Sequence, residues 1–372
     1  MKRALVVVLL AAAVVAAGAR ATPVPPVQAS AYLVVDARTG EVLAASDAHT
    51  ELRIASLTKL MTVLLTLENH KLTDVVTVDP RAADVGESAI ELDPGQKITV
   101  HDLLEGALIQ SANDAADALA LSIAPTYPAF AKLMNAKAKQ LGLDHTHFVR
   151  PDGLDSPGEY STAADVTKLA RIVMRNAFVR ATVLKETVTI ADGQELHTWD
   201  DLLGVFPGVF GVKTGHTDDA GWCQVSAVRG NGVDVYVTVL GGPTRSVRNE
   251  DLESLAAWGL AQFRTVLPVQ LGRTYATVAL PYGRASLDLV ARQPLQLTAH
   301  LGRPLTETIV APRVVRLPVH RGDTVGRIEI RYDGKLIGAR ALVASRTVKR
   351  PGLAGRLGYY SRRALHRLGH LL

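Results

Sequence analysis

The chain has 372 residues, 48% of them hydrophobic, so it can form a sizeable core and is long for one domain. Its net charge of +5 resides at its two ends. Residues 1–21 carry three basic residues and no acidic ones, residues 349–372 carry six and none, and the rest has a net charge of −4. A mildly acidic body argues against nucleic-acid binding, and a single cysteine, Cys223, excludes an internal disulfide.

The N-terminus is typical of a secretory signal peptide. Two basic residues precede a short apolar run, and Ala19 and Ala21 supply the small residues that a signal peptidase reads. The alternative is a retained membrane anchor, for which the apolar run is short. We therefore expect residues 1–21 to be a cleaved signal peptide, residues 22–29 to be a proline-rich linker, and the protein to be exported.

The following region mixes strand and helix patterns up to about residue 270. Strands are expected on both sides of the turn at residues 37–40 and in a long hairpin at residues 221–242. Residues 30–270 are therefore predicted to form one α/β (α+β) domain, with an antiparallel sheet flanked by helices. Helical periodicity is found after a capping Thr162 and at residues 56–69, 101–123, 129–141 and 250–266.

The last hundred residues divide into two further parts. Short alternating runs separated by Gly and Pro predict a small all-β domain at residues 274–348. Residues 349–372 have apolar residues at three- and four-residue steps with arginines between them, which indicates a basic amphipathic helix that binds an anionic membrane surface. The alternative is a disordered basic tail, which the glycines in this segment favour.

Three short motifs carry the chemistry. Ser56 and Lys59 are three residues apart at a predicted helix start, so a neutral, buried lysine could act as the base for a serine nucleophile. Alone, this Ser-x-x-Lys pattern is expected by chance, and the alternative is a capping serine with a solvated lysine. Ser111 and Asn113 form a Ser-x-Asn motif, and Lys213 begins a Lys-Thr-Gly tripeptide just before the long hairpin. The three motifs in this order are specific.

With these motifs the sequence resembles the serine-type D-alanyl-D-alanine carboxypeptidases, the low-molecular-mass penicillin-binding proteins. The similarity extends to the first hairpin at residues 33–40, the loop and helix start at residues 153–165, and the segment Gly-Val-Lys-Thr-Gly-His-Thr at residues 211–217. It is strong over residues 30–265 and looser in the β domain. The resemblance implies a serine β-lactamase/DD-peptidase-like fold and removal of the terminal D-alanine from peptidoglycan pentapeptides through an acyl-serine intermediate.

The resemblance also implies roles for individual residues. Ser56 would be the nucleophile and Lys59 its base, and Ser111 and Lys213 would pass a proton to the leaving amine. The remaining implied site residues contact the substrate: Asn113, Thr214, Gly215, His216 and Arg248, with Arg245 as the rival to Arg248.

The partners follow from the same resemblance, whereas the location follows from the predicted signal peptide and the basic tail. Peptidoglycan stem peptides would be the substrates and β-lactam antibiotics the inhibitors. No metal, organic cofactor or nucleic acid is expected. The location would be the periplasm or the outer face of the cytoplasmic membrane, with peripheral anchoring by the C-terminal helix.

Three other functions remain open. A β-lactamase would need a deacylating glutamate in a Glu-x-x-Leu-Asn-type motif, which is missing between Asn113 and Lys213. A D,D-endopeptidase uses the same residues on cross-links, and the third alternative is a non-catalytic penicillin-binding module. The chain also departs from the family in having Ala112 inside the second motif, and Asp200 and Asp201 in place of asparagines. We expect this last difference to affect local packing and not the chemistry.

Overall fold

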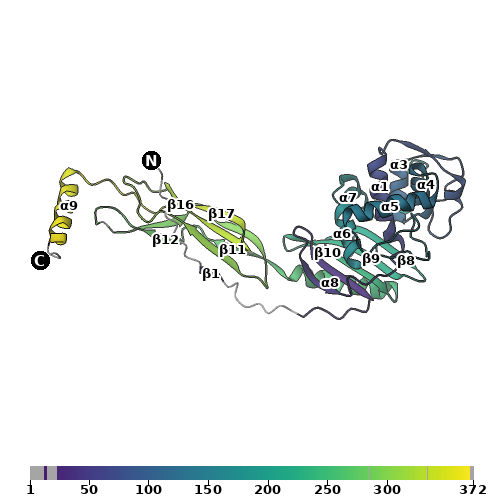
Figure 1. Cartoon of the computed structure of the whole chain (residues 1–372), viewed down its shortest axis with the longest axis horizontal. Helices are drawn as coiled ribbons and strands as arrows, with labels where there is room; N and C mark the ends of the chain where they lie inside the picture. The colour runs from purple at the N-terminus through teal and green to yellow at the C-terminus, as the bar shows by residue number, and fades with distance from the viewer. Residues whose placement is uncertain (1–11, 15–22, 284, 333, 369–372) are drawn as a thin grey trace. The chain divides into compact units, whose positions relative to one another are not determined.

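The computed structural model describes residues 12–14, 23–283, 285–332 and 334–368 (Figure 1). The chain divides into two compact units, one comprising residues 22–261 and the other the remainder. Most of the predicted signal peptide lies outside the described residues. Its described part, β1 (Ala12–Val14), pairs with β15 of the second unit.

A five-stranded antiparallel sheet forms the centre of the first unit. The strand order is β3-β2-β10-β9-β8. The two predicted hairpins supply four of these strands, and β8 pairs with β9 at the edge. The bounds are β2 (Ala31–Asp36), β3 (Val42–Ser46), β8 (Val209–Thr217), β9 (Gly221–Gly230) and β10 (Val233–Gly242).

Helices cover both faces of this sheet. On one face, Thr167 of α6 hydrogen-bonds to Thr238 of β10 at 2.6 Å. On the other, Gly259 of α8 packs against Val34 and Val235. Figure 1 shows α1, α3, α4 and α5 gathered beyond the α6 face, where the main apolar core lies. The helices of this unit are α1 (Lys59–Asn69), α2 (Pro80–Ala83), α3 (Val100–Glu105), α4 (Asn113–Ile123), α5 (Tyr127–Leu141), α6 (Ala163–Val173), α7 (Ala177–Thr182) and α8 (Arg245–Ala261).

Local sequence explains where several of these helices begin. The Oγ1 atoms of Thr99, Thr126 and Thr162 accept hydrogen bonds from backbone N–H groups in the first turns of α3, α5 and α6. The capping role predicted for Thr162 is confirmed. Two short two-stranded sheets complete the unit, formed by β4 (Val75–Thr77) with β5 (Lys97–Thr99) and by β6 (Thr187–Thr189) with β7 (Glu195–His197).

Two helix predictions are wrong in their extent. Residues 101–123 are not one helix, because a π-helical turn follows α3 and leads to Ser111, whose φ of 62° ends the first helix. Residues 250–266 are not one helix either, because α8 ends at Ala261 and Val266 lies in β11 (Phe263–Val269). Since β11 pairs with β14, the unit boundary falls after Ala261 and not near residue 270.

The second unit is built from antiparallel strands around its own core, and the predicted fold class is confirmed. A six-stranded sheet has the order β1-β15-β16-β17-β13-β12. The tail forms α9 (Leu353–Leu368), and no helix in the described ranges is long and apolar enough to cross a membrane. The remaining strand bounds are β12 (Thr274–Val278), β13 (Leu287–Ala291), β14 (Leu295–His300), β15 (Leu305–Val310), β16 (Thr324–Tyr332) and β17 (Lys335–Ala344).

Candidate active site

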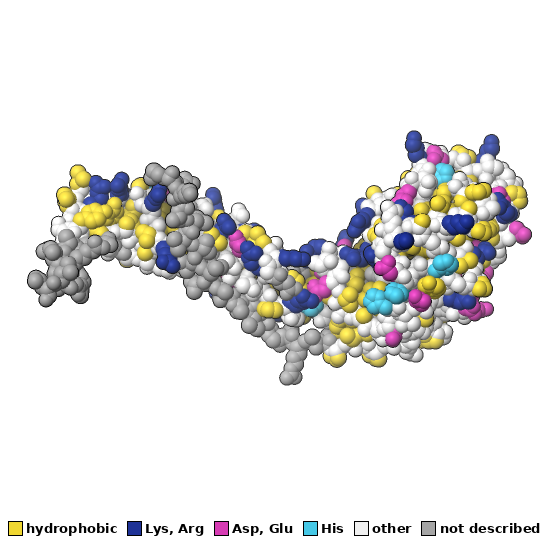
Figure 2. All heavy atoms as spheres, viewed as in Figure 1, with side chains coloured by type: hydrophobic (Ala, Val, Ile, Leu, Met, Phe, Trp, Pro, Cys, Tyr) yellow, Lys and Arg dark blue, Asp and Glu magenta, His cyan; other side chains and the backbone are white. Residues whose placement is uncertain are grey.

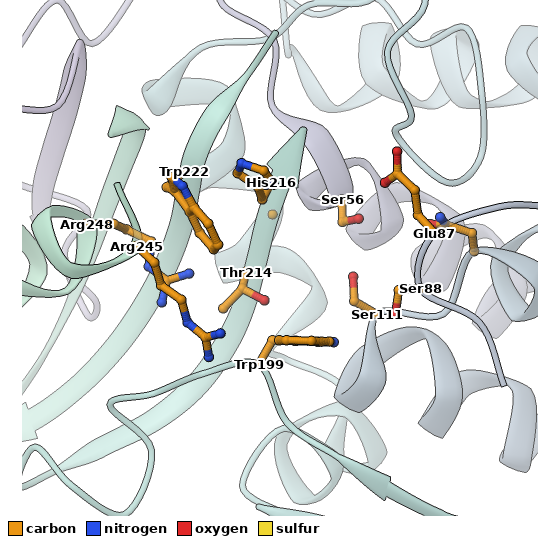
Figure 3. Close-up of a pocket in the computed structure, with 12 residues that line it drawn as sticks. Ser56, Glu87, Ser88, Ser111, Trp199, Thr214, His216, Trp222, Arg245 and Arg248 are labelled. Carbon is orange, nitrogen blue, oxygen red and sulfur yellow. The ribbon is translucent and has the colours of Figure 1, made fainter. Parts of the chain in front are cut away.

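A cavity of about 240 Å³ opens beside β8 in the first unit. Figure 3 shows Ser56 and Ser111 on one side of it, Thr214 on the strand between, and Arg245 and Arg248 at the opposite end. The lining residues are Ser56, Glu87, Ser88, Ser111, Asn113, Trp199, Thr214, Gly215, His216, Trp222, Arg245 and Arg248. Lys59 and Lys213 are buried and hydrogen-bond to Ser56 and Ser111, so the structure brings all the predicted site residues together.

Ser56 is held in a tight 3-10 turn, η1 (Ala55–Thr58), directly before α1. Ala55 has a φ of 49°, a strained value for a residue with a side chain. Two glycines let neighbouring backbone approach this turn. A Cβ on Gly153 would overlap the Ala55 carbonyl oxygen, and one on Gly215 would lie 3.0 Å from the backbone nitrogen of Ser56. The position of the serine therefore depends on the loop around Gly153 and on β8.

Lys59 is fully buried, and its amine contacts three segments of the chain. Nζ lies 2.8 Å from Ser56 Oγ, 2.6 Å from Asn113 Oδ1 and 2.7 Å from the backbone oxygen of Asp152. Burial lowers the pKa of Lys59 to about 8, against the opposing effect of the nearby Asp152 and Asp117 carboxylates. The amine therefore loses its proton more easily than an exposed lysine does.

A second buried lysine lies beside Ser111. Lys213, on β8, donates to Ser111 Oγ at 2.7 Å and to the backbone oxygen of Thr214 at 2.9 Å. Burial, followed by the positive charge of Lys59, holds the pKa of Lys213 well below its usual range. Ser111 lines the cavity from the left-handed turn that interrupts the helix. The helix break that the sequence pattern missed is therefore part of the site.

Asn113 begins α4, and both the oxygen and the nitrogen of its side-chain amide are hydrogen-bonded. Its Oδ1 accepts from Lys59, and its Nδ2 donates to the backbone oxygen of Gly86 at 3.0 Å. The backbone N–H of Asn113 also donates to the carbonyl of Ser88, at 2.7 Å. These contacts orient the side chain and leave the second N–H of its amide for another acceptor.

Aromatic rings surround the cations at the far end of the cavity. The ring of His216 lies 4.0 Å from that of Trp222, measured between centroids. Arg245 lies 5.4 Å from the ring of Trp199 and 6.0 Å from that of Trp222, and Arg248 lies 5.6 Å from Trp222. Cations at such distances are attracted to the ring faces. The rings therefore help to hold both guanidinium groups at the end of the cavity beyond Thr214, as Figure 3 shows.

The expectation that Asp201 affects only local packing is wrong. Its carboxylate accepts hydrogen bonds from Arg245 Nε at 2.7 Å, from Arg248 at 3.0 Å and from Asn249 at 2.9 Å. Arg245 donates a second hydrogen bond to the other oxygen. The hydrogen bonds from Arg245 are the largest cause of the lowered pKa of Asp201. One carboxylate therefore holds both arginines that the sequence offers for binding a substrate carboxylate.

Sequence reasoning missed several residues of the cavity. Trp199, Trp222, Glu87 and Ser88 line it but belong to none of the three motifs. Trp222 could have been found, because it follows Lys-Thr-Gly across a short turn and pairs with His216 in the sheet. The acceptor at residue 152 is a backbone oxygen, which leaves no signal in the sequence.

Two other chemically notable groups lie away from the cavity lining. Cys223 is buried as predicted, and burial raises the pKa of its thiol to about 11, so the thiol stays protonated. In the described part of the chain, His101, Asp102 and Glu105 are close enough together to hold a metal ion. Glu105 is already paired with Lys185, however, and nothing further in these ranges points to a metal.

Comparison with known proteins identifies the family. Residues 18–244 match the D-alanyl-D-alanine carboxypeptidase family, and residues 263–350 match the C-terminal domain of penicillin-binding protein 5. The carboxypeptidase DacC of Escherichia coli K12 is 33% identical over 354 residues, which covers 90% of this chain and 87% of the relative. The carboxypeptidase DacF of Bacillus subtilis 168 is 29% identical over 342 residues, covering 87% of each chain.

Solved structures agree with the sequence relatives. The carboxypeptidase DacD of Francisella tularensis superposes with a TM-score of 0.65 at 26% identity, covering 89% of this chain and 96% of that one. Penicillin-binding protein 5 of Haemophilus influenzae superposes with a TM-score of 0.64 at 28% identity, covering 88% of this chain and 99% of that one. Fold and site together therefore define a serine-type hydrolase of the penicillin-binding class. More particularly, the chain belongs to the D-alanyl-D-alanine carboxypeptidase family, and the family and enzyme class predicted from the sequence are confirmed.

The close contact at Gly153 yields a prediction about the serine turn. Gly153→Ala should abolish most D-alanine release from a peptide ending in D-alanyl-D-alanine, because the new Cβ would displace the Ala55 carbonyl and move Ser56. Gly158→Ala is the matched control, since Gly158 also has a positive φ, of 85°, but has open space around it. That control should lose only about 1–2 kcal/mol of unfolding free energy. Equal activities for the two variants would contradict this account of the turn.

Proposed function

We propose that the cavity cleaves the bond between two D-alanines at the end of a peptidoglycan stem peptide, with Ser56 as nucleophile and Lys59 as its base. The observation that carries this proposal is the 2.8 Å contact between Lys59 Nζ and Ser56 Oγ at the edge of the cavity. Ser56 attacks the carbonyl carbon, D-alanine leaves, and water hydrolyses the acyl-serine. β-Lactams acylate the same serine and inhibit the enzyme.

The three neighbours of Lys59 Nζ explain how it acts as a base. The side-chain oxygen of Asn113 and the backbone oxygen of Asp152 can only accept hydrogen bonds. A neutral amine has two N–H groups and one lone pair, so these two acceptors take both N–H groups. The lone pair then faces the remaining neighbour, Ser56 Oγ, whose proton it can accept. Once the amine is neutral, its surroundings therefore direct the lone pair to the serine that it activates.

Lys213 and Ser111 carry the proton onward to the leaving amine. Lys213 is buried beside Ser111 Oγ, and both its burial and the charge of Lys59 lower its pKa and favour its neutral form. Ser111 lies in the cavity between this lysine and the substrate position. Lys213 must first take up a proton, and in its ammonium form it can return one to the Ser111 hydroxyl as that hydroxyl donates its own proton to the leaving nitrogen, which regenerates the neutral amine.

The remaining residues bind the substrate. The backbone N–H groups of Ser56 and His216 stabilise the oxyanion, which the close approach at Gly215 allows. Asn113 donates its free N–H to the substrate amide. The terminal carboxylate binds at the end of the cavity where Thr214, Arg245 and Arg248 lie. Arginine suits this role because its planar fork matches a carboxylate.

We further propose that the protein is exported and held peripherally at the outer face of the cytoplasmic membrane, in the periplasm where there is one. The predicted signal peptide supports export. The tail supports anchoring, because Leu353, Leu357 and Tyr360 of α9 are strongly exposed and basic residues lie between and beyond them. Each basic residue near an anionic surface contributes about 1 kcal/mol.

The test of the proposed reaction uses Ser56→Ala. The variant should release no D-alanine from a D-alanyl-D-alanine peptide and should take no covalent label from a fluorescent penicillin, because both reactions need the Ser56 oxygen. Ser30→Ala is the control, since Ser30 is an exposed serine outside the cavity and its loss should leave both readouts unchanged. Full labelling of Ser56→Ala would refute the nucleophile assignment.

The same measurements separate the alternatives. Labelling without D-alanine release by the wild type would indicate a non-catalytic binding module. Rapid turnover of a chromogenic cephalosporin would indicate a β-lactamase. Cleavage of a cross-linked peptide dimer faster than release of terminal D-alanine would indicate an endopeptidase. We expect slow deacylation of penicillin, because the Glu-x-x-Leu-Asn-type motif that carries a deacylating glutamate is missing between Asn113 and Lys213.

The pKa of Lys59 predicts the pH dependence of acylation. The reactive form has a neutral amine, and the pKa is about 8, so the acylation rate should rise about tenfold per pH unit below that value and level off above it. Stopped-flow measurement of penicillin acylation tests this. Lys59→Arg should be inactive at every pH, since arginine keeps the charge but does not lose its proton. A flat profile in the wild type, or an active Lys59→Arg, would exclude Lys59 as the base.

The membrane proposal predicts the effect of removing the tail. A mature chain that ends at Val348 should no longer sediment with phosphatidylglycerol vesicles, whereas the full mature chain should. D-alanine release from a soluble peptide should be the same for both, because α9 contributes nothing to the cavity lining. A truncated chain that still sediments fully would mean that another surface binds the lipid.

A further inference from the structure

A second cavity of the first unit, of about 410 Å³, is lined largely by arginines. It lies where the C-terminal end of β2, the C-terminal end of α6, the helix α7 and the turn between β9 and β10 meet. Of its ten lining residues, five are arginines and one is acidic, Asp234. The arginines are Arg38, Arg171, Arg175, Arg180 and Arg229. None of them lines the first cavity.

The two cavities lie at opposite ends of the same strands. Trp222 at the start of β9 lines the first cavity, and Arg229 near its end lines the second. Seven residue steps separate them, which is roughly 23 Å at about 3.3 Å per residue. A ligand in the second cavity therefore does not overlap a substrate in the first.

Little of the positive charge in this cavity is compensated. Arg229 pairs with Asp234 through bonds of 2.7 and 2.8 Å. The side chains of Arg171 and Arg180 donate only to backbone carbonyls. Those of Arg38 and Arg175 are exposed and make no ion pair with any described residue. The charged lining therefore has a net charge of +4. Over much of the surface of this unit, Figure 2 shows basic and acidic side chains interspersed.

Two donors of the same cavity are available to a ligand. Tyr236 is 6% exposed and lines the cavity, and no hydrogen bond joins its hydroxyl to another described residue. Burial raises the pKa of Tyr236 to about 12, so the hydroxyl remains a donor. The Nε of Arg171 is also buried without a partner. Buried polar groups almost always have partners in native proteins, so Arg171 Nε indicates a ligand that supplies an acceptor, and the Tyr236 hydroxyl can donate to the same ligand.

We propose that this cavity binds the phosphate groups of an anionic ligand. Phosphate oxygens match the planar forks of arginine, and all five cations here are arginines, with no lysine among the lining residues. A net charge of +4 exceeds what one carboxylate would balance, whereas a ligand with two or more phosphates would balance most of it. The concave shape strengthens the local potential and favours such a ligand over a small monovalent anion. The proposal does not depend on the peptidase reaction.

Inorganic tripolyphosphate is the probe that tests the cavity. Isothermal titration of the full chain should show binding to the wild type. The double variant Arg38→Gln, Arg175→Gln should bind about tenfold more weakly or worse, because two charge-assisted contacts are lost. Both side chains are exposed and without ion-pair partners in the described ranges, so the variant should fold and should release D-alanine at the wild-type rate.

Two further variants make the test specific. Lys132→Gln with Lys139→Gln removes the same charge from exposed positions on α5 and should leave tripolyphosphate binding unchanged. Tyr236→Phe removes one oxygen atom and should weaken binding severalfold. Absence of binding to the wild type, or equal weakening by the arginine and lysine pairs, would overturn the proposal.

A second arm identifies the source of the phosphate. Binding of the full chain to phosphatidylglycerol vesicles is compared between the arginine and lysine double variants, with α9 intact in both. Weaker vesicle binding by the arginine variant alone would show that the cavity takes a lipid headgroup. Equal vesicle binding, together with lost tripolyphosphate binding, would show that it takes a soluble phosphate-bearing ligand. Either result supports phosphate recognition.

Discussion

Burial of the Lys59 amine is the constraint on which the rest of the site depends. A charged amine in an apolar core is costly unless several acceptors surround it, so the chain must bring polar atoms to one point. Those atoms come from the serine turn, from the start of α4 and from the loop that contains Asp152. The core around them is largely aliphatic, with Leu57, Leu60 and Met61 fully buried. Packing and catalysis therefore place opposite demands on the same turn, which its strained Ala55 reflects.

The second buried lysine makes the site a coupled pair. Each proton on Lys59 disfavours one on Lys213, since the charge of the first lowers the pKa of the second. The carboxylates of Asp152 and Asp117 act on Lys59 and raise its pKa. A single proton is therefore held preferentially on the Lys59 side, and Lys213 stays ready to accept one. Under the proposed reaction, this asymmetry gives the two lysines different roles although both are buried.

Side-chain identity and spacing predict only part of the site. Ser56 and Lys59 are in contact because they are three residues apart around the start of a helix. Lys213 lies at the site because β8 directly precedes the predicted hairpin and pairs with its first strand. Backbone geometry leaves a weaker signal. The left-handed Ser111 falls in the middle of one predicted helix, because apolar residues continue on both sides. Likewise, the apolar residues of 250–266 keep a helical period to the end of the segment. The last residues nevertheless form a strand, because β11 pairs with β14.

Asp201 shows why a departure from a family pattern is not enough to infer a function. In the sequence, Asp201 is an acid directly before a Leu-Leu pair, with no sign of its partners. Only the fold places it between Arg245 and Arg248. Two free guanidinium groups in one cavity would repel each other and would bind small anions indiscriminately. With Asp201 between them the group has a net charge of +1, which one carboxylate neutralises. Under the proposed function, a peptide with a single terminal carboxylate therefore fits this end of the cavity better than a dianion, and Asp201 contributes to that selectivity by fixing both arginines before the substrate arrives.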